Sequence, residues 1–552
     1  MAAIEDKTKD LSLQKKKQKQ TAGEKKSNFI SGLSNAVDGE VVTRFPPEPS
    51  GYLHIGHAKA ALLNQYFAQE YHGKLIIRFD DTNPTKERLE YQDAILEDLE
   101  LLDVKGDKIS YTSDFFEQLY GYCIQLLKEG KAYCDDTEQL QMRSERMKGV
   151  ESKCRGRSPE ENLRIFEEMA HGSPEGLKNC VRAKISIDSP NKALRDPVIY
   201  RCNLQPHHRT NDKFRVYPTY DFCCPIVDSI EGVTHALRTI EYRDRNDQYK
   251  WMLKALNLRK VQIWDFSRMN FIRTLLSKRK LQAIVSKGLV RGWDDPRFPT
   301  VRGIRRRGMT IEGLKKFILS QGPSKNVILL DWTSIWAVNK KFIDPVAARY
   351  VAVFATNAVK VTLSNGPEAR YEESRPRHKK NADLGTKQTR YSSHLLVDQD
   401  DARLLKENEE ITLMDWGNAI VEKIECNDDI VTNLTIKLHL EGDYRTTEKK
   451  ITWLSDDNDV LDCELVDFDH LISKDKLEEN ENFEDFITPQ TEFRTSAKAD
   501  SNLQSLPIGE SIQFERKGYF RLDQQASPGK SAQFFAIPDG KTVTKYGAKP
   551  SA

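Results

Sequence analysis

Two histidines, three residues apart, close a proline- and glycine-rich segment at residues 44–57 whose residue types suit a nucleotide site. The preceding run is β-branched and apolar, and residues 58–70 are rich in alanine and leucine, which predicts a strand, a loop and a helix. His54 and His57 then lie at the first helical turn, where unpaired N–H groups and the helix dipole favour a phosphate. Gly51 and Gly56 allow close approach of backbone to ligand. The alternative is a chance pair or half of a metal site.

A basic run at residues 277–280 follows a second strand-like run at 261–266. We expect it to form a loop just beyond the strand end, where Lys278 would suit a polyphosphate whose charge grows during a reaction. A basic run alone is most often solvated surface. Together with the histidine segment, however, it forms a specific pair of motifs.

This pair resembles the HIGH and KMSKS signatures of class I aminoacyl-tRNA synthetases. Further matches narrow the resemblance to the eukaryotic and archaeal glutamyl/glutaminyl branch; they lie at residues 78–84, 217–222, 293–300 and 488–493. Within the branch, Ser50 and Arg238 look like the cytosolic glutamyl-tRNA synthetases, because glutaminyl enzymes usually carry Asn at the first position and Cys at the second. The resemblance runs from about Val41 almost to the C-terminus.

The resemblance implies a glutamate–tRNA ligase, which makes glutamyl adenylate from L-glutamate and ATP and passes glutamate to the 3' end of tRNA-Glu, releasing AMP and pyrophosphate. Such a reaction needs positioning and charge neutralisation rather than a protein nucleophile. His54 and His57 would bind phosphate groups in the transition state, and Lys278 would hold the leaving pyrophosphate. Mg²⁺ would enter with ATP through phosphate oxygens, so no protein-bound metal is expected.

The resemblance also implies a set of ATP contacts. Leu275 stands where the family's second motif has its first lysine, which we interpret as the loss of one phosphate contact. The residues that we expect to contact ATP are His54, Gly56, His57, Glu241, Arg268, Met269, Leu275, Leu276, Ser277, Lys278 and Arg279.

Glutamate needs one partner for its ammonium group and at least one for its side-chain carboxylate. Asp80 aligns with the ammonium-binding position, a helix cap being the alternative. Arg44 and Arg238 are the candidate carboxylate partners, because a guanidinium matches a carboxylate in two hydrogen bonds; for Arg238 the alternative is a surface salt bridge. Glutamine would leave a buried guanidinium underpaired. The expected pocket consists of Arg44, Phe45, Pro46, Asp80, Tyr220, Asp221, Phe222, Cys223, Cys224 and Arg238, with the cysteines as small fillers.

Length and composition agree with a large cytoplasmic enzyme that has no membrane segment. The 552 residues are too many for one ordinary core, so two to four domains are expected. Charged residues make up 30% and mean hydropathy is −0.63, and no apolar run approaches the roughly 20 residues that span a bilayer. The nine cysteines show no Cys-x-x-Cys spacing, which argues against a zinc ribbon or a disulfide framework. Net charge is only +2, so nucleic-acid binding must come from local patches.

The pattern along the chain predicts three regions. Residues 1–40 are a lysine-rich disordered tail or linker, either solubilising or in contact with the tRNA backbone. Residues 41–340 alternate strands and helices, as in a Rossmann-type α/β domain, with an inserted region at about 103–214 that would bind the acceptor end of tRNA. Residues 341–552 show period-two segments, which predict β-barrels that bind the anticodon.

Relatives often carry a folded interaction domain in front of the catalytic part. The 40 residues before Val41 leave no room for one, so we expect either that it is naturally missing or that the sequence begins within the linker. Two other functions stay open: a glutaminyl-tRNA synthetase, distinguished at Arg238, and a non-catalytic tRNA-binding scaffold. The joint presence of His54, His57, Asp80 and Lys278 argues against the scaffold. Other translation or synthetase-complex proteins are possible partners.

Three local expectations concern positioning. Residues 86–102 should form a helix that packs through Leu89, Leu96 and Leu99. Thr310 should be the N-cap of a helix that runs to Ser320. The basic stretch 297–307 should be either a contact to the tRNA backbone or a solvated charge run.

Overall fold

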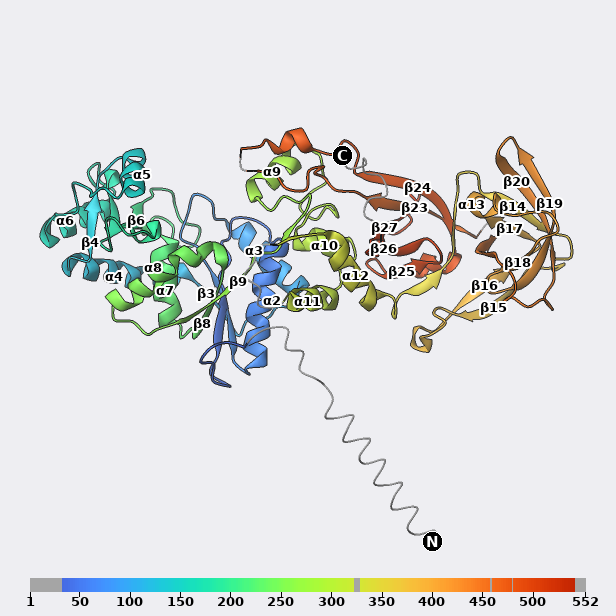
Figure 1. The fold of residues 1–552 in the computed structure, drawn as a ribbon, viewed down its shortest axis with the longest axis horizontal. Helices are drawn as coiled ribbons and strands as arrows, with labels where there is room; N and C mark the ends of the chain where they lie inside the picture. The colour runs from blue at the N-terminus through green and yellow to red at the C-terminus, as the bar shows by residue number, and fades with distance from the viewer. Residues whose placement is uncertain (1–31, 322–327, 457–458, 479, 542–552) are drawn as a thin grey trace, which may run out of the picture.

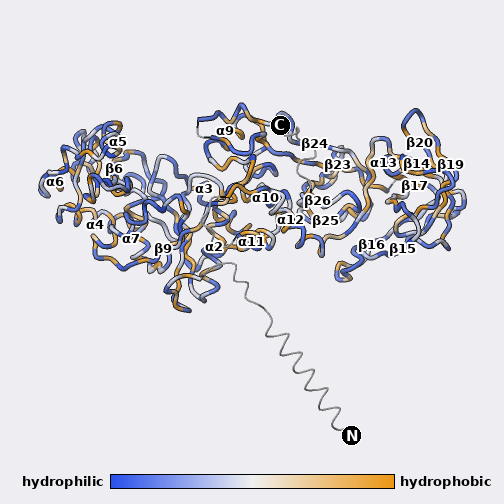
Figure 2. Tube along the Cα trace, in the orientation of Figure 1, coloured by the Kyte–Doolittle hydropathy of each residue, from blue (hydrophilic) through white to orange (hydrophobic). Residues whose placement is uncertain are grey.

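The computed structural model describes residues 32–321, 328–456, 459–478 and 480–541. These residues form an elongated molecule, with an α/β part at one end and a β-rich part at the other (Figure 1). The greater part of the predicted tail, residues 1–31, lies outside the described residues. Figure 2 shows hydrophilic and hydrophobic residues mixed along the described part of the trace. Among the described residues no helix has the length and apolarity of a membrane span.

Parallel strands form the centre of the α/β part. They are β1 (Val42–Phe45), β2 (Lys74–Phe79), β3 (Lys108–Tyr111), β8 (His235–Thr239) and β9 (Gln262–Phe266). One sheet has the order β1-β2-β3, and β8 pairs with β9. The second pair lies beside β1, because the N–H of Thr234 donates to the carbonyl of Val42 at 2.9 Å. Strand order therefore runs outward in both directions from the junction of β1 and β8. Ligands of open α/β sheets bind at such a switch point, beyond the carboxyl ends of the strands.

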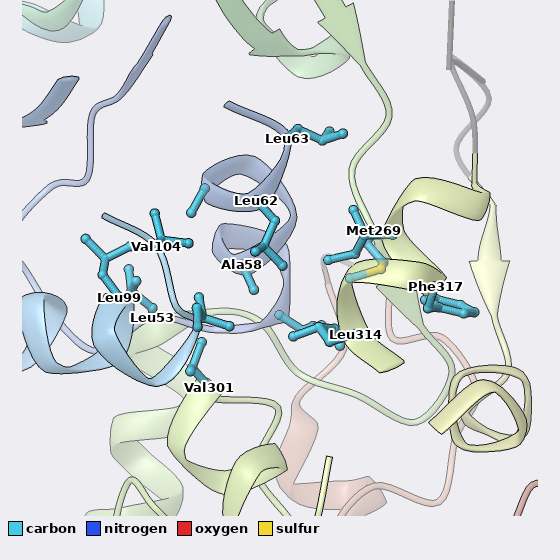
Figure 3. Packing of buried hydrophobic residues seen from close by; sticks show 14 of the residues in the cluster. Leu53, Ala58, Leu62, Leu63, Leu99, Val104, Met269, Val301, Leu314 and Phe317 are labelled. Atoms are coloured by element: carbon cyan, nitrogen blue, oxygen red, sulfur yellow. The ribbon is translucent and has the colours of Figure 1, made fainter. Parts of the chain in front are cut away.

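Helix α2 (Ile55–Glu70) is the central element of the catalytic core. Its alanines and leucines are small or flexible, so the helix is buried on nearly all sides. It packs against α3 (Leu89–Leu101), α10 (Val301–Arg306) and α11 (Ile311–Ser320) (Figure 3). The expected packing face of α3 is partly wrong. Leu99 is buried and Leu96 packs against the same cluster, but Leu89, the first residue of α3, is 56% exposed.

A separate four-stranded antiparallel sheet, in the order β4-β5-β6-β7, is inserted after β3. Its strands and neighbouring helices are α4 (Phe116–Lys128), β4 (Ala132–Asp135), α5 (Gln139–Lys148), α6 (Pro159–His171), β5 (Cys180–Ala183), β6 (Val198–Cys202) and β7 (Val216–Pro218). Helices α7 (Tyr220–Ile230) and α8 (Asn246–Ala255) then lead the chain back to the parallel strands, on either side of β8. A shared apolar cluster unites this insertion with α7 and α8.

Two seven-stranded sheets make up the β-rich part. One has the order β12-β25-β26-β27-β23-β24-β13 and the other β21-β18-β19-β20-β14-β17-β22, each around its own apolar cluster. The strands of the first are β12 (Ala348–Tyr350), β13 (Ala352–Phe354), β23 (Leu461–Phe468), β24 (Glu492–Ala499), β25 (Ser511–Phe514), β26 (Gly518–Gln524) and β27 (Ala532–Ile537). Those of the second are β14 (Val359–Leu363), β17 (His394–Val397), β18 (Glu410–Leu413), β19 (Gly417–Asn427), β20 (Ile430–Leu438), β21 (Lys450–Ile451) and β22 (Trp453–Ser455). Burial alternates along β14 and from Leu434 to Lys437 of β20, as period-two patterning predicts.

The remaining elements connect these units. They are β10 (Asn270–Phe271), α9 (Lys278–Ser286), β11 (Leu329–Leu330), α12 (Trp332–Ile343), the hairpin of β15 (Tyr371–Pro376) and β16 (Thr386–Tyr391), and α13 (Gln399–Ala402). The basic residues 277–280 were expected to form a loop, which is wrong from Lys278 onward, because α9 begins at that residue.

The arginine run at the end of α10 joins the two parts of the molecule. Arg306 donates two hydrogen bonds to Asp523 on β26, at 2.7 and 2.8 Å, and Arg307 donates to the carbonyl of Phe468 at 2.8 Å. Arg305 donates to the carbonyl of Met309. These three side chains therefore form hydrogen bonds within the protein. Neither of the two expectations from the sequence, a contact to the tRNA backbone or a solvated charge run, included such bonds.

Thr310 caps α11, as predicted, and its hydroxyl accepts from the N–H of Gly313 at 3.0 Å. Asn339 of α12, which is fully buried, fixes this turn. Its Oδ1 accepts from the N–H and hydroxyl of Thr310, both at 2.8 Å, and its amide group donates to the carbonyl of Gly308 at 3.0 Å.

We expect Asn339→Ala to lower the free energy of unfolding by about 2–3 kcal/mol, because it strands buried polar groups without partners. Urea denaturation measures the change. Lys341→Ala, an exposed substitution on the same helix, is the matched control and should stay within about 0.5 kcal/mol of the wild type. An equal loss in both variants would contradict the role of Asn339.

Candidate active site

A cavity of about 810 Å³ lies beyond the carboxyl ends of β1, β2 and β8, at the switch point of the parallel strands. Many of the predicted site residues line it. They are Arg44, Phe45, Pro46, His54, Gly56, His57, Asp80, Tyr220, Arg238, Glu241, Arg268 and Lys278. The cavity thus brings together residues from both motifs and from the predicted amino-acid pocket.

The two histidines cap the helix that carries them. The Nδ1 atom of His54, the N-cap, accepts from the N–H of Gly56 at 3.1 Å, and the Nδ1 atom of His57 accepts from the N–H of His54 at 3.2 Å. Their rings stack, with centroids 3.8 Å apart. Gly56 makes this possible, since a Cβ there would lie 2.9 Å from Cε1 of His54.

Capping fixes the chemistry of both rings. Each Nδ1 accepts a hydrogen bond, so the proton of the neutral ring sits on Nε2, which is then a donor. Burial, together with Arg268 and Lys278, lowers the pKa of His54 to about 3. Burial and the neighbouring His54 ring lower the pKa of His57 well below its usual value. Both histidines are therefore neutral hydrogen-bond donors at neutral pH, suited to phosphate oxygens.

The unpaired N–H groups expected at the start of α2 are not found. The N–H groups of His54 and Gly56 bond to imidazole nitrogens, that of Ile55 donates to the carbonyl of Pro299 at 2.9 Å, and that of His57 to the carbonyl of His54 at 2.8 Å. Anion binding at this helix start must therefore use the imidazole rings rather than the backbone.

Lys278 reaches the cavity from the first turn of α9. Its Nζ atom donates to the hydroxyl of Ser50 at 3.0 Å, and that hydroxyl donates to Glu48 at 2.9 Å. Gly51 has a φ of +151°, and a Cβ there would lie 3.2 Å from Cδ of Lys278. Burial lowers the pKa of Lys278, although nearby Glu48 opposes the shift. The ammonium group is thus held next to the loop that leads into the histidines.

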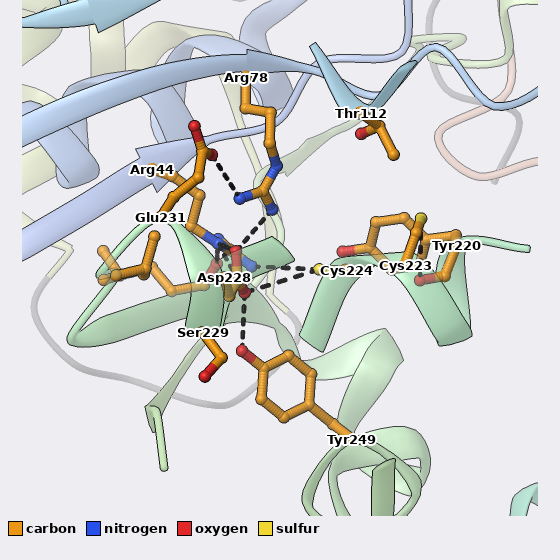
Figure 4. A network of polar contacts seen from close by, with 12 residues as sticks. Arg44, Arg78, Thr112, Tyr220, Cys223, Cys224, Asp228, Ser229, Glu231 and Tyr249 are labelled. Atoms are coloured by element: carbon orange, nitrogen blue, oxygen red, sulfur yellow. Dashed lines mark hydrogen bonds and ion pairs between the residues drawn. The ribbon is translucent and has the colours of Figure 1, made fainter. Parts of the chain in front are cut away.

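Arg44 is anchored rather than free. Its Nε donates to both carboxylate oxygens of Asp228, at 3.0 and 3.1 Å, and Nη1 donates to the carbonyl of Leu237 at 3.0 Å (Figure 4). Asp228 also accepts from Arg78 at 2.5 Å and from the hydroxyl of Tyr249 at 2.7 Å. Burial disfavours charge here, but the two arginines hold the pKa of Asp228 at about 2. Whether Arg44 contacts a substrate carboxylate stays a prediction.

Asp80 differs, because it lines the cavity and no cation of the described residues forms an ion pair with it. Its Oδ1 atom is buried and has no hydrogen-bond partner. Burial and the nearby carboxylate of Glu48 raise its pKa to about 6, against the attraction of Arg78. A substrate ammonium group would satisfy this oxygen.

Arg238 is a buried cation without a carboxylate. It is 4% exposed, its Nε has no hydrogen-bond partner, and among the described residues no carboxylate oxygen lies within 4.0 Å of its guanidinium. Nη1 donates to Oδ1 of Asn246 at 3.3 Å. The rings of Tyr242 and Tyr249 lie 5.2 Å from its Cζ atom. A buried, unpaired guanidinium in a cavity calls for an anionic ligand.

Comparison with known families decides what kind of protein carries this site. Residues 40–345 match the catalytic domain of "tRNA synthetases class I (E and Q)". Residues 347–441 and 450–523 match two models described as the anti-codon binding domain of the same synthetases.

The chain belongs to the class I tRNA synthetases of the E and Q group. The predicted fold class is confirmed: a class I catalytic domain followed by all-β anticodon-binding domains.

Relatives of this synthetase are similar over almost its whole length. A protein of Saccharomyces cerevisiae named "Glutamate--tRNA ligase, cytoplasmic" is 65% identical over 95% of this chain and 74% of its own. A protein of the same name from Arabidopsis thaliana is 51% identical over 94% and 73%. A "Bifunctional glutamate/proline--tRNA ligase" of Cricetulus griseus is 50% identical over 92% of this chain and 34% of its own.

The other predicted site residues lie outside the cavity lining. Asp221 pairs with Arg245 at 3.0 Å. Phe222, Cys223 and Cys224 are buried on α7, and the thiol of Cys224 lies 3.7 Å from Arg44. The side chain of Met269 packs in the core beside α2 (Figure 3), and that of Leu275 packs against Leu281 and Phe298. Leu276 is half-buried, whereas Ser277 and Arg279 are exposed. Their roles stay predictions.

The structure adds residues that the sequence analysis missed. Glu48, Tyr242 and Arg245 line the cavity, and Glu48 could have been found as the one carboxylate within the proline-rich loop. Lys59 is buried, and its Nζ donates to the carbonyl of Ser267 at 2.6 Å, which joins α2 to the segment that follows β9. Burial lowers its pKa to about 8. No periodicity in the sequence distinguishes this lysine from a solvated one.

Two clusters bring potential metal ligands together in the described part of the chain. In the first, formed by Glu87, His207 and His208, Nε2 of His207 bonds to the carbonyl of Asp81 and Nδ1 accepts from the N–H of Arg209, so that ring offers no free lone pair. In the second, the three potential ligands already have protein partners. These contacts are Asp135–Arg182, Asp136–Arg157 and Cys154–Asp136.

We expect Gly56→Ala to reduce aminoacylation about a hundredfold, because the new Cβ displaces the ring of His54 by a fraction of an ångström or more. The thermal midpoint should hold or rise, since alanine favours a helix. Gly121→Ala on α4, where a Cβ meets nothing within 4 Å, is the matched control and should keep full activity. Full activity in Gly56→Ala would contradict the capping arrangement.

Proposed function

We propose that this cavity activates L-glutamate with ATP and transfers the glutamyl group to the 3' end of tRNA-Glu. The chain is a glutamate–tRNA ligase, the activity named for relatives 50–65% identical over more than nine-tenths of its length. The observation that supports glutamate as the substrate is Arg238, a buried guanidinium that no carboxylate of the described chain neutralises.

Substrate charges match the charges of the cavity. The ammonium group of glutamate would lie against the unpaired Oδ1 of Asp80, and its side-chain carboxylate against Arg238. Glutamine has no charge to offer Arg238, so that its binding would leave the cation buried and unpaired. Selection between the two amino acids thus follows from charge rather than size.

Activation needs alignment and charge stabilisation. An α-carboxylate oxygen of glutamate attacks the α-phosphorus of ATP, the bond to the β-phosphate breaks, and pyrophosphate leaves with its electron pair. Nε2–H groups of His54 and His57 would donate to phosphate oxygens as charge develops. Lys278, now bonded to Ser50, would turn to the leaving pyrophosphate. Mg²⁺ carried by ATP would neutralise further phosphate charge.

Transfer completes the reaction. A hydroxyl of the terminal ribose attacks the carbonyl carbon of the adenylate, an ester bond forms, and AMP departs with the electron pair of the broken anhydride, its phosphate taking up the hydroxyl proton. The strands β4, β5 and β6 with their helices, within the proposed insertion at about 103–214, would hold the acceptor end next to the cavity. We propose a catalytic region at residues 41–340 and an anticodon-binding region at residues 341–552. The tRNA would bind along both regions.

The cytoplasm is the location that the relatives' names give. Association with other synthetases is a further proposal, supported by relatives in which the glutamate ligase forms part of a bifunctional protein.

Charging of total tRNA with labelled glutamate and, separately, glutamine tests the assignment. We expect the wild type to charge glutamate alone and Arg238→Cys to lose about a hundredfold or more in kcat/KM for glutamate, because a buried ion pair is removed. Charging with glutamine by the wild type would assign the chain to the glutaminyl enzymes. Charging with neither amino acid would favour a tRNA-binding scaffold.

The pKa of Asp80, about 6, sets an expected pH dependence. Above pH 6 the carboxylate is ionised and pairs with ammonium; as pH falls below 6 it is protonated and the pair is lost. Hence kcat/KM for glutamate should fall about tenfold per pH unit below pH 6. His54, with a pKa of about 3, adds nothing in this range. Asp80→Asn should have low activity that does not fall further below pH 6. A fall of kcat/KM below pH 6 that persists in this variant would refute the assignment.

A further inference from the structure

Arg238 and Asp265 are partners in the register of β8 and β9, yet they do not form an ion pair. Partner residues on adjacent parallel strands project to the same face of the sheet. Opposite charges in such positions attract each other. Here no carboxylate oxygen of the described residues lies within 4.0 Å of the Arg238 guanidinium. Some other group must therefore keep the two charges apart.

Asn246, the first residue of α8, is that group. Its amide nitrogen donates to both carboxylate oxygens of Asp265, at 3.1 and 3.3 Å, and its Oδ1 accepts from Nη1 of Arg238 at 3.3 Å. An ionised carboxylate only accepts hydrogen bonds and a guanidinium only donates them. The two neighbours therefore allow Asn246 a single orientation, with nitrogen toward Asp265 and oxygen toward Arg238.

Asn246 therefore orients the guanidinium of Arg238 but does not neutralise its charge. One nitrogen is fixed by a neutral acceptor, while the buried Nε stays unpartnered and the positive charge stays uncompensated. Two other arginines of the cavity wall contrast with this. Arg44 is paired with Asp228, and Arg245 with Asp221. An acidic residue in place of Asn246 would occupy Arg238 in the same way.

We propose that Asn246, held by Asp265, is a positioning residue for amino-acid selection: it orients Arg238 through a neutral acceptor and leaves its charge for the side-chain carboxylate of glutamate. The inference rests on the proposed function. It adds that selection depends on a residue that would not touch the substrate.

Two substitutions at Asn246 separate orientation from charge. Asn246→Ala removes the acceptor, so KM for glutamate should rise about tenfold. Asn246→Asp places a carboxylate beside Arg238, which competes with the substrate, so kcat/KM for glutamate should fall about a hundredfold. In both variants KM for ATP should match the wild type, and in Asn246→Ala the thermal midpoint should match it too. Charging assays at saturating tRNA and a thermal melt provide these values.

Asp247→Ala, at the exposed neighbouring position, is the matched control and should behave as the wild type. Three outcomes would overturn the proposal. One is a KM for glutamate within twofold of the wild type in Asn246→Ala. Another is Asn246→Asp no worse than Asn246→Ala. The third is a parallel rise of the KM for ATP with a lower melting temperature, which would indicate a merely structural role.

Arg238→Ala in the same assays distinguishes this inference from the proposed function. Loss of glutamate charging in Arg238→Ala, with no effect of the Asn246 substitutions, would overturn only the role of Asn246. An unchanged KM for glutamate in Arg238→Ala would overturn both proposals.

Discussion

The buried carboxylate of Asp228 is the interaction on which the cavity depends. It lies on α7 and accepts from Arg44 on β1, from Arg78 on β2 and from Tyr249 on α8. One side chain thus joins two of the strands that end at the cavity, β1 and β2, to the helices α7 and α8. Two guanidinium groups around one carboxylate leave net positive charge, and Glu231 at 3.1 Å from Arg78 compensates the second. Without Asp228, buried cations would stand unpaired beneath the site, which is strongly destabilising.

Above this neutralised layer, the cavity wall carries charges that remain uncompensated. Asp80 and Arg238 each present a buried polar atom with no partner, whereas Arg44, at the floor, has its Nε paired and is fixed. The histidines stay uncharged because they are buried near two cations. The chain therefore separates charges that hold the fold from charges that await a ligand, and the separation is made by hydrogen-bond partners rather than by residue type.

Much of the fold could be predicted from the sequence, because local composition determines it. The β-branched run before the prolines and the alanine-rich run after them gave strand and helix close to their true limits, and Thr310 was recognisable as a cap. Features that depend on side-chain direction could not be predicted. The sequence places His54 and His57 correctly but does not reveal that their rings occupy the backbone donors of α2. Burial of Met269 likewise comes from tertiary packing.

The contacts of the arginines at the end of α10 could not be predicted for the same reason, because they depend on tertiary packing. As a sequence, residues 305–307 resemble any basic surface run, and only the fold brings Asp523 of β26 and Asp294 to Arg306 as carboxylate partners. Arg238 can be recognised from its position in a family motif. Its neutral neighbour Asn246 cannot, because hydrogen bonds that join three separate elements produce no characteristic residue spacing in the sequence.

Helix α10 has a mechanical consequence. Just before its start, the carbonyl of Pro299 accepts from Ile55, next to His54, and at its end Arg306 is bonded to β26. Its six residues span about 9 Å. The helix is thus a short strut between the histidine segment and the anticodon-binding part. A tRNA that displaces β26 must either break the pair between Arg306 and Asp523 or move the segment that bears His54.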